Sequence, residues 1–128
     1  MRSLRILIVE DEDEVRGVLA EYLTGQGHAV VAVPSGQGAL ALVKGEGSPF
    51  DVAVVDWNLP GITGRDVIAS IRAASPRTRV LISTGEIQAR FRPGHAQASV
   101  VYKPYSLRDL HDRVVSLVEG SAGGAADA

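Results

Sequence analysis

The chain has 128 residues, enough for one domain with a single hydrophobic core. Its composition, 45% hydrophobic and 22% charged, is that of an ordinary globular protein. The sequence has no cysteine, which excludes disulfides, thiolate metal sites and cysteine nucleophiles, and its net charge of −2 argues against a broad nucleic-acid-binding surface.

Five short apolar stretches, rich in β-branched residues, recur along the chain and end in polar residues. Near-continuous apolar runs of this length are typical of strands buried on both faces of a parallel sheet. The first run is too short to span a membrane and no cleavage site follows it, so we expect a cytoplasmic protein. The predicted strands are Leu4–Val9, Ala29–Val33, Val52–Val55, Val80–Ser83 and Val100–Tyr102.

Segments with a helical spacing of apolar residues lie between these strands. The first helix is predicted over 14–24, ending at the glycines of 25–27, and the second over 35–44. Two further helices are predicted to begin at the capping boxes Thr63–Asp66 and Ser106–Asp109. The residues predicted to face the core are Val15, Val18, Leu19, Tyr22 and Leu23, then Ala39, Leu40 and Val43, then Val67, Ile68 and Ile71, and finally Leu107, Leu110, Val114 and Leu117.

Alternating strands and helices with short connections predict an α/β fold with a parallel sheet covered on both faces. The segment Glu86–Gln97 contains Pro93 and Gly94 and few periodic apolar residues, so any helix there is expected to be short or irregular. Gly120–Ala128 is small and polar, which predicts a disordered tail or the start of a linker. We therefore expect one domain over residues 1–119.

Acidic residues follow two of the predicted strands. Glu10 and Asp11 come after the first strand, and Asp56 comes after the third. Ligands of open α/β sheets bind beyond the carboxyl ends of the strands, where these three carboxylates would converge and repel one another. An oxygen-only, partly hydrated site of this kind favours Mg²⁺. The ordinary explanation for such acids is a solvated helix start, and we favour it for Glu12 and Asp13.

Thr84 and Lys103 stand at the ends of the fourth and fifth predicted strands, at the same edge of the sheet. The lysine ammonium group would hold an anion arriving at Asp56, and Gly85 leaves space for it. A carboxylate nucleophile, a metal, a cation and a hydroxyl donor are the parts of phosphoryl transfer to a carboxylate. Each residue alone also fits an ordinary turn or loop position, so the prediction depends on their occurring together.

These residues resemble the motifs of the receiver domain of two-component response regulators, the CheY-like superfamily, over about residues 4–119. The resemblance implies a flavodoxin-like, doubly wound, five-stranded parallel sheet in the strand order 2-1-3-4-5. The matching motifs are Ile8-Val9-Glu10-Asp11, Val55-Asp56-Trp57-Asn58-Leu59-Pro60 with Gly64, Ser83-Thr84-Gly85, and Lys103-Pro104.

The resemblance also implies the chemistry of the site. Asp56 would accept a phosphoryl group from a histidine kinase or a histidine phosphotransfer protein, with Mg²⁺ as cofactor. Thr84 and Lys103 would contact the phosphoryl oxygens. The chain would catalyse its own phosphorylation and dephosphorylation and no other reaction. The implied metal ligands are Glu10, Asp11, Asp56 and the carbonyl oxygen of Asn58.

The positions that tune and transmit the signal match the family unequally. Asn58 and Glu86 form a pairing similar to that of chemotaxis-type regulators, which implies fairly rapid self-dephosphorylation. The two switch positions are Thr84 and Val100, and the second is usually aromatic in the family. We therefore expect the signal to be read out by ordering of the segment 90–92 (Arg-Phe-Arg) instead of by an aromatic side chain.

The sequence leaves the output open between an unknown downstream target and a homodimer. Family members commonly use the face formed by the fourth helix, fifth strand and fifth helix for either purpose. We expect no direct nucleic-acid or membrane binding. The chain is either a stand-alone regulator or part of a longer regulator or hybrid kinase. Trp57, beside the acceptor, is expected to report Mg²⁺ binding by its fluorescence. The three histidines, predicted to be surface residues without metal-ligand spacing, are His28, His95 and His111.

Three other classes of protein share parts of this pattern. A haloacid-dehalogenase-type phosphatase typically needs Asp-x-Asp, but Asn58 replaces the second acid and the chain has no room for a cap domain. A nucleotide- or flavin-binding flavodoxin-like domain needs a phosphate loop where this chain has the acids of 10–14. A degenerate receiver that acts only in docking would not need the retained acids, threonine and lysine.

Overall fold

The computed structural model describes residues 3–44, 50–85 and 98–119. The strands and helices that the apolar pattern predicts are present over these residues, with ends that differ by one or two residues. The strands are β1 (Arg5–Val9), β2 (Ala29–Val33), β3 (Val52–Asp56), β4 (Arg79–Thr84) and β5 (Ala98–Tyr102). The helices are α1 (Asp13–Gly25), α2 (Gly36–Lys44), α3 (Gly64–Ala74) and α4 (Leu107–Glu119).

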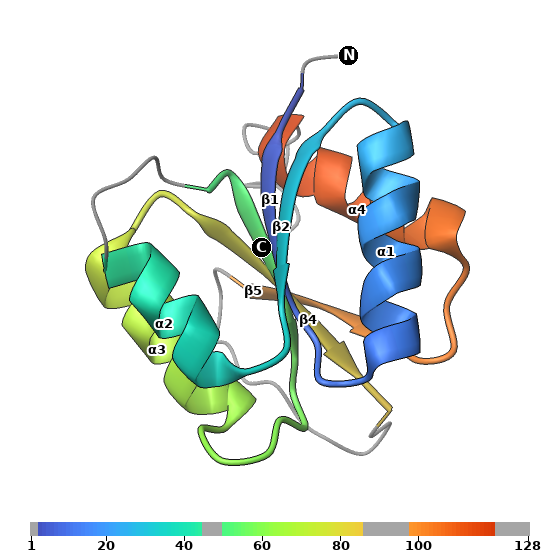
Figure 1. Cartoon of the computed structure of the whole chain (residues 1–128). Coiled ribbons are helices and arrows are strands. Elements are labelled where there is room, and N and C mark those ends of the chain that lie inside the picture. The colour runs from blue at the N-terminus through green and yellow to red at the C-terminus, as the bar shows by residue number, and fades with distance from the viewer. Residues whose placement is uncertain (1–2, 45–49, 86–97, 120–128) are drawn as a thin grey trace.

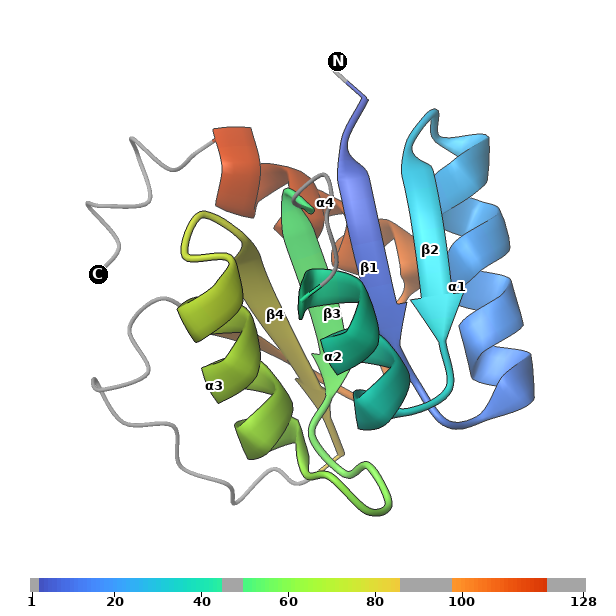
Figure 2. The same ribbon diagram turned by 60° about the vertical axis from the view of Figure 1, so that its left-hand side comes forward.

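The strands form one parallel sheet in the order β2-β1-β3-β4-β5. Figures 1 and 2 show α1 and α4 on one face of this sheet and α2 and α3 on the other. The strand order reverses between β1 and β3, and in open α/β sheets the ligand crevice lies beyond the carboxyl ends of the strands at that point. The predicted fold class is confirmed.

Each face of the sheet carries its own hydrophobic cluster, because successive side chains of a strand point to opposite faces. The central strand β3 is buried at every position, as expected for a strand covered on both sides. Burial of each large aliphatic side chain contributes roughly 1.5–3 kcal/mol. The cluster beneath α2 and α3 includes Leu7, Val9, Ala53, Val55, Val80 and Ile82. The cluster beneath α1 and α4 includes Ile6, Ile8, Val52, Val54, Leu81 and Val101.

Local signals fix the helix ends. The helix α1 ends at Gly25, and Gly27 has a φ of 98°, which glycine adopts without steric cost. The Thr63 hydroxyl accepts the Asp66 N–H at 3.2 Å at the start of α3. At the start of α4 the Ser106 hydroxyl accepts the Asp109 N–H at 3.0 Å. Both predicted N-caps are therefore present.

Two predictions about side-chain position are wrong. Val18 was expected on the buried face of α1 but is 51% exposed, because this helix buries a narrower stripe centred on Leu19 and Leu23. His28 and His111 were expected at the surface but are 5% and 6% exposed. Periodicity gives the direction of a helix face without showing how wide the contact beneath it is.

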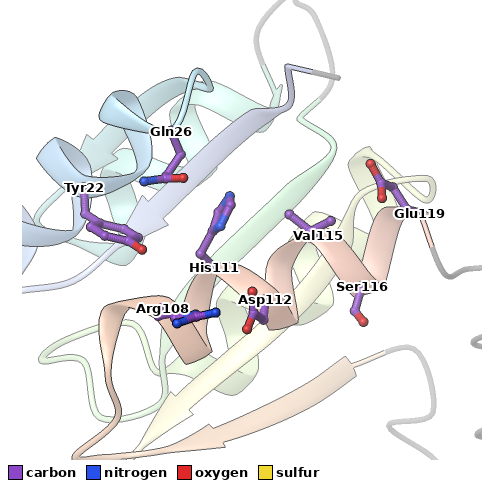
Figure 3. A pocket seen from close by; sticks show the side chains of 8 residues that line it. All are labelled: Tyr22, Gln26, Arg108, His111, Asp112, Val115, Ser116 and Glu119. Carbon is purple, nitrogen blue, oxygen red and sulfur yellow. The ribbon is translucent and has the colours of Figure 1, made fainter. Parts of the chain in front are cut away.

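The two buried histidines satisfy each other. Their Nε2 atoms lie 2.9 Å apart, and His28 Nδ1 accepts the Leu4 N–H at 3.1 Å. Figure 3 shows His111 rising from α4 toward Gln26 at the end of α1, beside a pocket of about 590 Å³. The rings of Tyr22 and His111 pack edge to face, with their centroids 6.2 Å apart. A hydrogen-bonded pair of this kind can be buried where a lone histidine could not.

Several predictions fall on residues that are not described. They concern the segment 86–97, which was predicted to be short or irregular, with its proposed read-out at 90–92 and His95, and the tail 120–128. Among the helices that the structure describes, none is long and apolar enough to cross a membrane.

Candidate functional site

Three carboxylates meet at the carboxyl edge of the sheet. Asp56 is the last residue of β3, Glu10 follows β1, and Asp11 continues into the turn before α1. One oxygen from each lies within 4.8 Å of the others. Because β1 pairs with β3, Glu10 and Asp56 lie together on one face of the sheet, as their positions at strand ends predict.

Two of these carboxylates are nearly buried and are held by backbone N–H groups. Glu10 is 2% exposed and Asp56 is 5% exposed, whereas Asp11 is exposed. The Glu12 N–H donates to Glu10 Oε2 at 3.1 Å, and the Asn58 N–H donates to Asp56 Oδ1 at 3.0 Å. Burial raises the pKa of Glu10, and the negative charge of Asp56 raises it further.

Lys103 supplies the positive charge that faces this cluster. Its Nζ donates to Asp56 Oδ2 at 3.3 Å and to Glu10 Oε1 at 3.4 Å. Burial alone would lower the pKa of this lysine, but the attraction of Asp56 and then of Glu10 outweighs it and raises the pKa. The Lys103 N–H also donates to the Thr84 carbonyl at 2.8 Å, which extends the pairing of β4 and β5 up to the site.

The remaining predicted site residues lie around this centre. Thr84 is the last residue of β4 and is fully buried. Asn58 lies in the turn after Asp56, and Val100 pairs with Ile82 and packs on the cluster beneath α2 and α3. The other predicted tuning residue, at position 86, lies outside the described part of the chain.

A close approach of two backbones holds the turn after Asp56. A Cβ added at Gly64 would lie 2.8 Å from the Trp57 Cα and 2.9 Å from the Asp56 carbonyl oxygen, distances that real Cβ atoms essentially never show. The Trp57 N–H donates to the Ser83 carbonyl at 2.9 Å. Glycine at position 64 therefore lets α3 begin directly against the acceptor turn.

The structure brings two further residues to the site, Ser83 of the matched motif Ser83-Thr84-Gly85 and Tyr105, to which the sequence analysis gave no role there. Ser83 is paired with Asp56, so their side chains share a face, whereas Thr84 follows on the opposite face. Tyr105 lies two residues after Lys103 and packs on the cluster beneath α1 and α4. The register of β3 with β4, which no local motif gives, is what brings Ser83 to the site.

The carboxylate cluster fits a hard divalent cation. Its oxygens are close enough for shared coordination, and Asp11 remains exposed toward solvent, as a partly hydrated ion such as Mg²⁺ requires. The large pocket between α1 and α4 has none of these residues in its lining, so it is separate from the cluster.

A five-stranded parallel sheet with clustered carboxylates and a lysine at its carboxyl edge defines the chain as a receiver-type α/β domain. A family model described as the response regulator receiver domain matches residues 6–115, so the chain belongs to this family. Its place is therefore in two-component signalling.

Individual relatives agree with this assignment. The chain is 38% identical over 118 residues to the transcriptional regulatory protein TcrA of Mycobacterium tuberculosis, covering 90% of this chain and 46% of TcrA. It is 30% identical over 120 residues to the sensor kinase CckA of Brucella abortus, covering 91% of this chain and 13% of that protein. The chain thus spans less than half of either relative.

A solved structure gives the same result. The response regulator TrrA from Thermotoga maritima, in complex with Mg²⁺ and BeF, matches with a TM-score of 0.77 and 28% identity. The match covers 89% of this chain and 98% of that one.

Proposed function

We propose that Asp56 accepts a phosphoryl group in a Mg²⁺-dependent reaction, from a histidine kinase or a histidine phosphotransfer protein. The observation that carries this proposal is the pairing of a nearly buried Asp56 carboxylate with Lys103 Nζ at 3.3 Å, within 4.8 Å of the oxygens of Glu10 and Asp11. A carboxylate nucleophile, a fixed cation and a cation-binding cluster thus converge at one point of the sheet edge.

Each residue of the site has a separate role in phosphoryl transfer. An Asp56 oxygen forms the new bond to phosphorus while the bond to the donor breaks, and the donor leaves with that electron pair. Lys103, which bridges two carboxylates before transfer, is placed to hold a phosphoryl oxygen afterwards. The Asn58 N–H keeps the carboxylate oriented. Bound Mg²⁺, held by Glu10, Asp11, Asp56 and the Asn58 carbonyl, would neutralise charge on the phosphoryl group.

The signal is proposed to be short-lived. Asn58 and Glu86 occupy the tuning positions, and both Thr84 and Lys103 would contact the phosphoryl oxygens. The lifetime follows from chasing labelled protein in Mg²⁺ after the phosphoryl donor is removed. A phosphoryl-Asp56 that persists for many hours would contradict this part of the proposal.

The wider role of the chain is proposed in the same terms. Residues 1–119 would act as a cytoplasmic receiver domain, with 120–128 as a tail or linker. Output would pass to a downstream target or a second copy through the face formed by the predicted fourth helix, β5 and the last helix, labelled α4 here, without an aromatic side chain at Val100. The similarity to both a transcriptional regulator and a sensor kinase leaves a stand-alone protein and a longer one as alternatives.

Intact mass after treatment with acetyl phosphate tests the proposed function. The wild type is expected to gain one phosphoryl group in Mg²⁺ and none in EDTA, and Asp56→Asn none in either. Asp112→Asn, a change of the same kind at an exposed position on α4, serves as the matched control and should label like the wild type. Equal labelling of wild type and Asp56→Asn would refute the proposal.

A further inference from the structure

Two buried hydroxyl groups on the same face of the sheet as the acceptor aspartate form no hydrogen bond with the described residues. They are Ser83 Oγ and Tyr105 Oη. Ser83 is 2% exposed, and the tyrosine oxygen is also buried. Buried polar groups are nearly always paired in folded proteins, so two orphans beside one site need an explanation.

Both groups belong to the same side of the sheet as the acids. Ser83 is in register with Asp56 on one side and Val101 on the other. In-register neighbours of a parallel sheet share a face and stand about 4.8 Å apart. Tyr105 packs on the cluster beneath that face, after the turn that begins at Lys103. The serine thus lies beside the aspartate in the sheet, on the face against which Tyr105 packs.

The pKa of Tyr105 is shifted by burial, by Ser83 and by the charged groups of the site. Burial raises the pKa of Tyr105, and the charges of Glu10 and Asp56 add to the increase. The Ser83 hydroxyl and the Lys103 ammonium lower it in part. Ser83 lowers this pKa as a hydrogen-bond partner of Tyr105, although the two hydroxyl groups fall short of the geometry of a formed hydrogen bond. A neutral tyrosine in this position is a hydrogen-bond donor.

The acceptor carboxylate has room for another donor. Its Oδ1 accepts the Asn58 N–H and its Oδ2 accepts Lys103 Nζ, whereas an ionised carboxylate has about four acceptor positions. Apolar side chains at positions 83 and 105 would pack without unsatisfied oxygens. Without hydrogen bonds, the two hydroxyl groups therefore lower the stability of the fold. The functional site is where they can donate hydrogen bonds.

We propose that Ser83 and Tyr105 form a hydrogen-bond relay that sets the lifetime of phosphorylated Asp56. In this relay Tyr105 Oη donates to Ser83 Oγ, and Ser83 Oγ donates to the carboxylate of Asp56. The inference rests on the proposed function and adds two positioning residues to it.

The direction of the effect follows from where negative charge appears. In hydrolysis a water oxygen bonds to phosphorus, the bond from phosphorus to Asp56 breaks, and the electron pair returns to the carboxylate. The proton of the water leaves with phosphate or solvent. A donor aimed at that carboxylate oxygen is stronger toward the charged product than toward the phosphorylated form, so it speeds hydrolysis. In the forward reaction the carboxylate is charged at the start, so the donor stabilises the reactant and does not speed phosphorylation.

Decay of the phosphorylated protein in saturating Mg²⁺, after removal of acetyl phosphate, measures the effect. We expect Ser83→Ala and Tyr105→Phe each to slow decay roughly three- to ten-fold, the size of one hydrogen bond, with labelling rates near the wild type. The double variant should be no slower than Ser83→Ala, because the two groups act as a unit. Ser83→Thr, which keeps a hydroxyl group, should restore decay.

Two controls separate the relay from a structural role. Tyr102→Phe changes an exposed tyrosine at the end of β5 and should leave decay unchanged. Tyr105→Phe should leave the melting temperature close to that of the wild type, because one hydrogen bond between neutral groups contributes little net stability. A lower melting temperature with labelling and decay slowed together would show a structural role and overturn the relay.

The outcomes also separate this inference from the proposed function. If the wild type labels at Asp56 but both variants decay at the wild-type rate, the relay alone is overturned. If the wild type does not label at all, the proposed function fails and the relay fails with it.

Discussion

Lys103 is the residue on which the charge balance of the site depends. Its ammonium nitrogen stands between two nearly buried carboxylates, 3.4 Å from Glu10 Oε1 and 3.3 Å from Asp56 Oδ2. Pairs of buried charges gain little net stability, since the attraction is offset by lost hydration. The arrangement is better explained by the anion that the lysine would hold than by the stability it would add.

Removal of that charge should separate phosphoryl transfer from metal binding. We expect Lys103→Met to slow labelling by acetyl phosphate about 100-fold, the typical loss for one group that stabilises transferred charge. Mg²⁺ binding, followed by Trp57 fluorescence, should persist or tighten, because the ammonium group no longer competes for the carboxylates. Lys44→Met, at an exposed position at the end of α2, is the control. Unchanged labelling in Lys103→Met would contradict this role.

At this scale the sequence predicts the residues that belong to motifs and misses those that depend on pairing. Glu10, Asp56 and Lys103 could be found because each follows a strand, and strand ends of a parallel sheet meet at one edge. A role at the site could not be given to Tyr105, or to Ser83 of the matched motif, because the register of β3 with β4 and the packing after β5 are not local properties.

At the scale of elements, the start of α3 and the acceptor turn share one narrow contact at Gly64. We expect Gly64→Ala to lower the free energy of unfolding by about 2 kcal/mol and to slow labelling, because the new Cβ would clash with the backbone of Trp57. Urea unfolding measures the loss.

The matched control for this change is Gly17→Ala in α1. A Cβ there meets nothing within 4 Å, so alanine should stabilise the helix by about 0.5–1 kcal/mol. Equal stability of Gly64→Ala and the wild type would show that the contact at the turn is looser than described.

The contact between α4 and the start of β2 should depend on pH through the buried histidine pair. The Leu4 N–H occupies His28 Nδ1, so the neutral ring carries its proton on Nε2, toward His111. Burial lowers the pKa of His28 below its usual 6.5, and His111 lowers it further. The neutral His28 ring therefore contributes stability above about pH 6.5, and this contribution is lost as the pH falls from there through the lowered pKa of His28.

Thermal unfolding at a series of pH values tests this dependence. The melting temperature of the wild type should fall by several degrees between about pH 7 and about pH 5. His111→Gln keeps an acceptor for His28 and removes one ring, so its melting temperature should fall less over the same range. The same slope in both proteins would contradict the expected coupling.

At the scale of the whole molecule, the fold could be predicted because local and long-range patterns agree. Buried strands separated by capped helices fit one parallel arrangement, and the acids and lysine fix which edge is functional. The exposure of Val18 and the burial of His28 and His111 could not be predicted, because they depend on how closely the neighbouring elements approach these side chains. Sequence periodicity does not contain that distance.

The central claim is that Asp56, among three carboxylates whose oxygens lie within 4.8 Å of one another, is the one that accepts the phosphoryl group. Borohydride reduction of the wild type after treatment with acetyl phosphate and Mg²⁺, followed by peptide mass spectrometry, tests it most directly. Borohydride reduces an aspartyl phosphate to homoserine, and it would reduce a glutamyl phosphate to the alcohol that is one methylene longer. We predict homoserine at position 56 and unchanged residues at Glu10 and Asp11. Reduction at Glu10 or Asp11, or none at position 56, would contradict the claim.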